Sequence, residues 1–272
     1  SNAMGSPDTI PGKLTAALIT VAQQYHVYIA SGMQEKDQKT GKLYNAAVLV
    51  GPNGFIGKYR KNQLNVDDSS DKTPGNLGFP VFDTEIGKIS LLICYDDSQL
   101  QSLLLPALRG ADIIAYPLAA AKFLRDEQDS SINHTTMGSM ATLPGWVGLN
   151  VIAADYTGAL VLPQYNVTAQ FPGASSIWDS NGKTLKSLPT STLANEGNYA
   201  DKIIYATLDT SKPNPQREFW IKHRRPELYN MYNVYQIQNG NFVTHKQTQI
   251  SALLVQYAPK AGDVQDNYEK IS

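Results

Sequence analysis

The sequence predicts an α/β fold, because short runs of β-forming residues alternate with segments of helical periodicity along its 272 residues. The predicted strand over 86–94 ends in a run that is apolar on both faces, as expected at the centre of a covered sheet. A helix over 100–108 and a strand over 112–116 follow it, and this order implies a right-handed parallel crossover. A Gly-Pro-Asn-Gly turn at 51–54 adds an antiparallel hairpin.

Each predicted element has a local reason in the sequence. A helix over 14–25 follows the break at Pro11 and Gly12 and repeats apolar residues at helical spacing. Gly110 stands where the C-cap of the helix over 100–108 belongs. Pro144 is expected to kink a longer helix over 132–149. The remaining strands are predicted over 26–30, 46–50, 55–61, 151–154, 175–178 and 203–208.

Charge and composition exclude several classes of function. The chain has 23 Lys and Arg against 24 Asp and Glu, and it has no basic block of the kind that binds nucleic acid or anionic lipid. No apolar run approaches the roughly 20 residues that a membrane span needs. The single cysteine, Cys94, predicts a cytoplasmic protein, and the absence of metal and phosphate motifs predicts one without a cofactor. The expected partner is a small molecule.

Cys94 is the first candidate for chemistry, because a thiolate is the strongest nucleophile that a side chain offers near neutral pH. It is predicted at the carboxyl end of a buried strand, where α/β sheets bind their ligands. The alternative is a buried cysteine that acts as a small apolar residue. Lys61 is the second candidate, since strand alternation places it on one face with Tyr59 and lets it point inward. The alternative for Lys61 is a solvated strand end.

Short motifs follow one another along most of the chain. They lie at residues 41–47, 57–61 (Gly-Lys-Tyr-Arg-Lys), 73–76, 82–84, 92–96 (Leu-Ile-Cys-Tyr-Asp), 110–117 and 224–229. In order and spacing they resemble the nitrilase or carbon-nitrogen hydrolase superfamily. The resemblance implies a four-layer α-β-β-α sandwich, a homodimer, and a Glu-Lys-Cys triad that acts on amides, nitriles or carbamoyl groups.

Carried over to this sequence, the resemblance makes Cys94 the nucleophile, Lys61 the triad lysine and the backbone N–H of Tyr95 an oxyanion donor. An ammonium beside the thiol lowers its pKa and stabilises the oxyanion that develops during attack. A thioester-type intermediate would then form as the amine leaves, and water would cleave it.

The catalytic glutamate of the family has no counterpart in this sequence. Residues 4–12 are too few to hold the family's first strand, helix and second strand, which need roughly 30 residues or more. Neither Glu35 nor Glu85 matches the position of that glutamate. The candidates for a replacement acid, in the loop before Pro74 and Gly75, are Asp67, Asp68 and Asp71.

Three segments are expected along the chain. Residues 1–3 resemble the remnant of an expression tag, and 4–244 a nitrilase-like domain that lacks its first elements. The tail over 245–272 resembles the opening strand and helix of a further nitrilase domain. Alternatively, its strand over 250–257 folds back into the vacant first-strand position.

The resulting hypothesis is a fragment of a longer protein that is itself an active carbon-nitrogen hydrolase, whereas this chain is expected to be a poor catalyst because the glutamate is absent. The alternative is a nitrilase-like pseudoenzyme that serves as a binding or oligomerisation module. The related N-acyltransferases fit less well, because they normally carry membrane spans. The substrate stays open: residues 118–121 predict a wide apolar wall near the site. The side chains that are candidates for its remaining surface, or alternatively for core and structural positions, are Phe123, His134, Trp146 and Tyr156.

Overall fold

The computed structural model describes residues 6–65, 68–120, 122–124, 143–162, 167–189, 203–211 and 214–228. The chain divides into two compact units, Ser1–Arg224 and Arg225–Ser272. The first unit contains the described sheets and α-helices, and the second unit is described over 225–228 alone. The tail predicted over 245–272 therefore lies outside the described residues.

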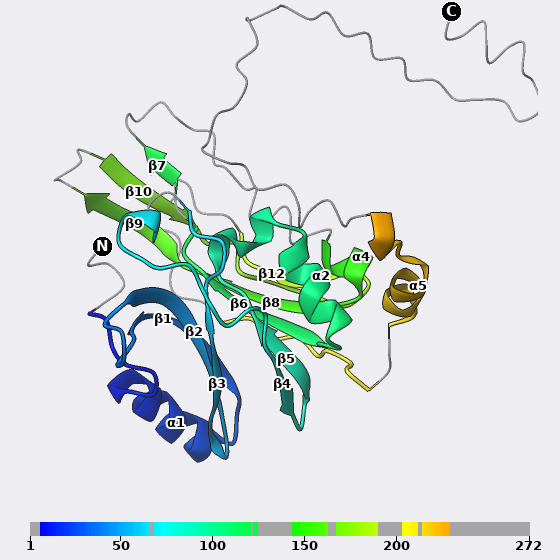
Figure 1. Cartoon of the computed structure of the whole chain (residues 1–272), viewed down its shortest axis with the longest axis horizontal. Helices are drawn as coiled ribbons and strands as arrows, with labels where there is room; N and C mark the ends of the chain where they lie inside the picture. The colour runs from blue at the N-terminus through cyan, green and yellow to red at the C-terminus, as the bar shows by residue number, and fades with distance from the viewer. Residues whose placement is uncertain are drawn as a thin grey trace, which may run out of the picture. The chain divides into compact units, whose positions relative to one another are not determined.

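The described residues of the first unit form three sheets (Figure 1). An antiparallel sheet has the order β1-β2-β3, from β1 (Ile29–Lys36), β2 (Leu43–Gly51) and β3 (Gly54–Arg60). The largest sheet has the order β12-β11-β8-β6-β5-β4, from β4 (Val81–Thr84), β5 (Gly87–Leu91), β6 (Ile113–Leu118), β8 (Asn150–Asp155), β11 (Ser176–Trp178) and β12 (Thr184–Ser187). A small antiparallel sheet joins β7 (Lys122–Leu124), β10 (Val167–Pro172) and β9 (Thr157–Leu162). In the largest sheet, β5, β6 and β8 are parallel, as the crossover predicted.

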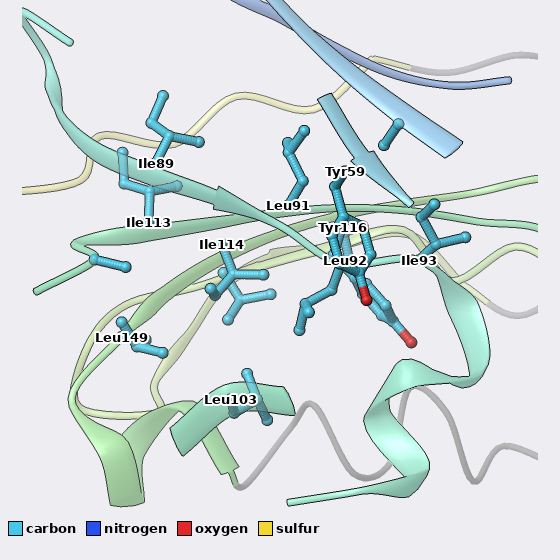
Figure 2. Packing of buried hydrophobic residues seen from close by; sticks show 14 of the residues in the cluster. Tyr59, Ile89, Leu91, Leu92, Ile93, Leu103, Ile113, Ile114, Tyr116 and Leu149 are labelled. Atoms are coloured by element: carbon cyan, nitrogen blue, oxygen red, sulfur yellow. The ribbon is translucent and has the colours of Figure 1, made fainter. Parts of the chain in front are cut away.

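Helices cover the two larger sheets. They are α1 (Lys13–Tyr25) on β2 and β3, and α2 (Gln101–Leu108) on the largest sheet; α4 (Leu143–Val147) packs against α2, and α5 (Pro215–His223) packs against α4. Alternate residues of β2 serve opposite faces, as the two-residue period of a strand requires. Val48 packs in a cluster with Leu18 of α1, whereas Leu49 packs in the core between the sheets. Leu103 of α2 joins that same core from the other side of the largest sheet (Figure 2). The predicted four-layer α-β-β-α architecture is confirmed.

Several predicted boundaries move. The strand predicted over 26–30 begins later, at Ile29, because His26 takes a left-handed conformation at the end of α1. The strand also continues further than predicted, to Lys36. The strand predicted over 86–94 ends at Leu91, three residues before Cys94. The helix predicted over 132–149 is described from Leu143 to Val147, so that Pro144 lies in its first turn and residues 132–142 fall outside the described ranges.

The strand predicted over 203–208 is wrong. The backbone is described there without a strand assignment, and the side chains of Ile203 and Tyr205 are among the most exposed apolar groups. A run of β-forming residues needs a neighbouring strand and a packed face to become a strand, because β-propensity reflects packing more than backbone preference.

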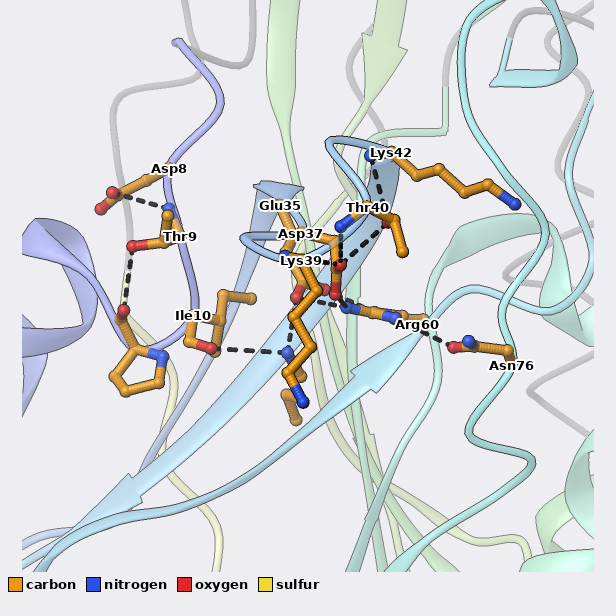
Figure 3. Close-up of polar contacts among 12 residues, drawn as sticks. Asp8, Thr9, Ile10, Glu35, Asp37, Lys39, Thr40, Lys42, Arg60 and Asn76 are labelled. Carbon is orange, nitrogen blue, oxygen red and sulfur yellow. Dashed lines mark hydrogen bonds and ion pairs between the residues drawn. The ribbon is translucent and has the colours of Figure 1, made fainter.

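A buried ion network lies beside the β1-β2-β3 sheet (Figure 3). Glu35 is 1% exposed and contacts Lys58 Nζ at 2.5 Å, while Arg60 donates two hydrogen bonds to it at 2.6 and 2.7 Å. Arg60 also pairs with Asp37 at 2.6 Å and stacks on Tyr44 at 3.8 Å. Burial raises the pKa of Glu35, but the hydrogen bonds from Arg60 and Lys58 outweigh it and hold that pKa below its ordinary value. The carboxylate of Glu35 is thus paired with the side chains of Lys58 and Arg60, which gives it a structural role.

Replacing Glu35 with Ala should lower the free energy of unfolding by about 3–5 kcal/mol, because two cations lose their buried partner. Urea unfolding at pH 7 measures the change. The matched control is Asp83→Ala, which removes the 83%-exposed partner of Lys88 and should leave stability unchanged within error. The wild-type contribution of Glu35 is complete above its unfolded pKa of 4.5 and declines as pH falls toward its lower folded pKa. Equal losses in both variants would contradict a stabilising network.

Candidate active site

Cys94 opens the short 3-10 helix η3 (Cys94–Ser98) just beyond β5. Its φ of 44° lies in the left-handed region, which costs a residue with a side chain roughly 1–2 kcal/mol. The hydroxyl of Tyr116 donates a hydrogen bond to the Cys94 carbonyl oxygen, and Asp96 N–H donates to Ile93 at 3.1 Å. The cysteine is therefore held in a strained turn by the surrounding sheet.

The carboxylate of Asp96 links this turn to the β1-β2-β3 sheet through hydrogen bonds. Its Oδ2 accepts hydrogen bonds from the Tyr59 hydroxyl and the Ile93 N–H, both at 2.9 Å. Its Oδ1 accepts from Gln63 N–H at 3.0 Å. Asp96 is buried, and burial raises its pKa to about 6 despite these donors. Figure 2 shows Tyr59 and Tyr116 projecting toward the turn that follows Ile93.

Lys61 follows β3 directly and is 1% exposed. Its Nζ lies 2.5 Å from Asp68 Oδ2, at the start of the 3-10 helix η2 (Asp68–Ser70). Asn45 Nδ2 donates to both carboxylate oxygens of Asp68, at 3.2 and 3.3 Å. The backbone N–H of Asp68 donates to Asn65 Oδ1 at 2.8 Å. These contacts hold a charged ammonium inside the fold, because buried charges require a partner.

The loop that carries Pro74 and Gly75 crosses close to the Lys61 backbone. Gly75 N–H donates to the Lys61 carbonyl at 2.8 Å. A Cβ at position 75 would lie 2.1 Å from the Arg60 carbonyl oxygen, which no side chain can tolerate. Glycine at this position thus allows the loop to close over the lysine.

Cys94, Lys61 and Asp68 line one cavity of about 410 Å³. Its walls include Gly32, Asn45, Pro117, Leu118, Ala119, Asp155 and Tyr156. The structure does not bring Asp71 to this cavity, because its carboxylate pairs with Lys72 at 2.6 Å near the surface. Asp67 lies outside the described residues. The side chain of Tyr95 is exposed, while its peptide N–H follows the cysteine within η3.

The charge state of Cys94 is set by opposing influences. Burial raises the pKa of its thiol to about 11, the positive charge of Lys61 lowers it, and the negative charge of Asp155 raises it further. The backbone N–H of Ala119 also favours the thiolate. Since burial outweighs the ammonium, the resting thiol is neutral at pH 7.

Asp155 was not singled out from the sequence, although the strand that it ends was predicted. Its Oδ1 accepts a hydrogen bond from Ala120 N–H at 3.1 Å, and its buried Oδ2 has no partner among the described residues. Burial raises its pKa to about 7. The available signal was a carboxylate at the carboxyl end of a predicted strand, where α/β sheets place their ligand-binding residues.

The predicted aromatic surface is realised in part. Tyr156 lines the cavity and packs edge-to-face on Phe171, with ring centroids 4.9 Å apart. Trp146 does not line it, because α4 presents this side chain to solvent at 69% exposure. The Phe123 side chain and His134 lie outside the described set.

No group of three or more His, Cys, Asp or Glu side chains in the described part of the chain is arranged to hold a metal ion. Among the described helices, none combines the length and apolar character needed to cross a membrane.

The fold and the cavity define a four-layer α/β protein with a cysteine, a charged lysine and carboxylates at one site. The family model of the carbon-nitrogen hydrolases matches residues 2–217, and the chain belongs to this family. A solved carbon-nitrogen hydrolase from Helicobacter pylori G27 is similar in structure, with a TM-score of 0.70 and 25% identity over 80% of this chain and 75% of that one.

Curated relatives include a nitrilase of Pyrococcus abyssi, 47% identical over 106 residues, which are 39% of this chain and 40% of the relative. A β-ureidopropionase of Arabidopsis thaliana is 29% identical over 78% of this chain and 52% of its own length. A citrullinase of Francisella tularensis is 27% identical over 77% of this chain and 71% of its own length. The alignments with the first two relatives thus span about half of their lengths or less.

The alkylation of Cys94 by iodoacetamide should accelerate about tenfold per pH unit between pH 7 and 10, because the thiolate reacts and its pKa is about 11. Intact mass reports this reaction directly, since the sequence holds one cysteine. Lys61→Met should slow alkylation at pH 9 by removing the charge that lowers the thiol pKa. Lys72→Met, at a pair outside the cavity, is the matched control and should change nothing. A rate that levels off near pH 8, or equal effects of both variants, would contradict this electrostatic account.

Proposed function

We propose that this chain carries a cysteine-dependent carbon-nitrogen hydrolase site for small amides, nitriles or carbamoyl compounds. The observation that carries the proposal is the shared cavity of Cys94 and the Asp68-paired Lys61. A permanent ammonium beside a thiol is the arrangement that activates a cysteine and stabilises an oxyanion. Relatives named β-ureidopropionase and citrullinase support a substrate with a carbamoyl or amide carbon.

The proposed reaction begins with attack of the Cys94 sulfur on the carbonyl or nitrile carbon. The charge that develops on the substrate is stabilised by Lys61 and by the backbone N–H of Tyr95. With an amide, the amine leaves and a thioester remains on Cys94, which water then hydrolyses to the acid and the free thiol.

Turnover by this chain should be slow. With a thiol pKa of about 11, only about one molecule in ten thousand carries a thiolate at pH 7. Asp68 is engaged by Lys61 and Asn45, so its carboxylate serves mainly to hold the lysine in place. A nitrilase-like binding module without turnover is the competing function.

The test is ammonia release from a short primary amide, an N-carbamoyl amino acid and an aliphatic nitrile. We expect slow release from at least one of them, a transient acyl adduct on Cys94 by intact mass, and loss of both in Cys94→Ala. Circular dichroism checks that this variant remains folded. Release that persists in Cys94→Ala would refute the cysteine-dependent site, and no release and no adduct with any compound would refute the hydrolase and favour the binding module.

We also propose that the chain forms a homodimer through α2. Leu105 and Leu108 of this helix are exposed apolar side chains, which are typical of contact surfaces. Light scattering after size exclusion should give twice the chain mass of 29.8 kDa. Leu105→Glu should shift the mass toward the monomer, whereas Leu14→Glu on α1, at equal exposure, should not. A monomeric wild-type chain would refute the dimer.

A further inference from the structure

The cavity contains a carboxylate that the proposed reaction has not used. Asp155 ends β8, and its Oδ1 accepts the Ala120 N–H at 3.1 Å. Its Oδ2 is buried in the cavity wall without a hydrogen-bond partner among the described residues. A buried polar atom left without a partner costs free energy, so its retention needs an explanation.

The backbone after β6 donates hydrogen bonds to both the cysteine sulfur and this carboxylate. Ala119 directs its N–H to Cys94, and the next residue, Ala120, directs its N–H to Asp155. Because these two amides are consecutive, the sulfur and the carboxylate are anchored on adjacent peptide units. The negative charge of Asp155 also raises the pKa of the Cys94 thiol.

The other charged groups of the cavity are already committed. Lys61 and Asp68 form an ion pair at 2.5 Å, and Asn45 holds both oxygens of Asp68. Asp97, another buried carboxylate that acts on Cys94, is not part of the cavity lining. Asp155 therefore remains the lining carboxylate with an oxygen available to a proton.

We propose that Asp155 is a catalytic acid and base that passes the thiol proton of Cys94 to the leaving nitrogen of the substrate. This inference rests on the proposed hydrolase function. It identifies the group that transfers protons during the reaction, a role that neither Cys94 nor Lys61 fills.

The proton balance closes over one cycle. Asp155 Oδ2 takes the proton from the thiol as the sulfur–carbon bond forms, and it gives that proton to the nitrogen as the carbon–nitrogen bond breaks. The ionised carboxylate then takes a proton from water as hydroxide adds to the thioester. It returns that proton to the departing sulfur, which restores the neutral thiol and the carboxylate.

The electrostatics of Asp155 suit this exchange. Burial raises its pKa to about 7, while the N–H groups of Ala120 and Tyr156 favour the charged form. Proton transfer is most effective when the pKa of the transferring group lies near the working pH. Both protonation states are therefore present near neutral pH.

The experiment compares two acetyl donors that differ in their need for a proton. p-Nitrophenyl acetate expels a phenolate that leaves without protonation, whereas the nitrogen of p-nitroacetanilide must be protonated to leave. Acetylation of Cys94 by each is followed at pH 8 through nitrophenol or nitroaniline release and intact mass. Asp155→Asn is the test variant, because its amide oxygen can still accept the Ala120 N–H. Asp97→Asn is the matched control.

In Asp155→Asn, we expect acetylation by the ester to slow far less than acetylation by the anilide. The variant loses the base that takes the thiol proton, but it also loses a negative charge that raises the Cys94 pKa, and the ester needs no acid for its leaving group. Acetylation by the anilide should fall by about 10²–10⁴-fold. The ester-to-anilide ratio should rise accordingly, while Asp97→Asn leaves that ratio unchanged. A purely structural role of Asp155 would slow both donors by the same factor and leave the ratio unchanged.

The remaining outcomes separate the two proposals. If wild-type Cys94 is acetylated by the ester and the ratio does not change in Asp155→Asn, the role of Asp155 is refuted and the nucleophile stands. If the wild type is acetylated by the ester and not by the anilide, the role of Asp155 is likewise refuted and the nucleophile stands. If neither donor acetylates Cys94, the hydrolase function is refuted and the role of Asp155 falls with it.

Discussion

The buried carboxylate of Asp96 is the constraint on which the site depends. It receives hydrogen bonds from the end of one sheet, through Tyr59 and Gln63, and from the turn that presents the cysteine on the other. Lys61 lies between those two donors in the sequence, so the same carboxylate sets the position of the lysine relative to Cys94. A single side chain thereby joins two layers of the sandwich at the turn that carries Cys94.

Burial of β3 between the layers explains the unusual density of paired charge. Lys58, Arg60 and Lys61 lie within four residues, and each is matched to a carboxylate from another segment. Lys58 and Arg60 share Glu35 on one side of the strand, and Lys61 takes Asp68 at its end. Alternation along the strand thus separates the cations that stabilise the sheet from the one that faces the cavity.

Much of the fold could be predicted from local pattern. The first helix, the hairpin and the parallel crossover each rest on periodicity or turn chemistry that neighbouring residues determine. The extension of β1 to Lys36 was missed because its polar residues are buried by partners distant in sequence, above all Glu35 by Arg60. The run over 203–208 failed in the opposite way, since among the described residues it pairs with no strand and leaves the side chains of Ile203 and Tyr205 exposed.

The candidate site was only partly predictable. Cys94, Lys61 and Asp68 were named from the sequence, and the structure places all three on one cavity. Asp96 and Asp155 were missed, because whether an aspartate is buried depends on the layers packed around it. Aspartates are common in turns and at strand ends, so their residue type alone carries no such signal.

The left-handed backbone at Cys94 has a consequence for how this chain can change. Glycine would adopt that conformation with less strain, so a mutation that destroys the thiol there can yield a better-folded protein. Mutations that stabilise the backbone at this position therefore remove the thiol, and mutations that keep the thiol keep the strain. The backbone at residue 94 thus sets the stability of the turn against the presence of a thiol in the cavity wall.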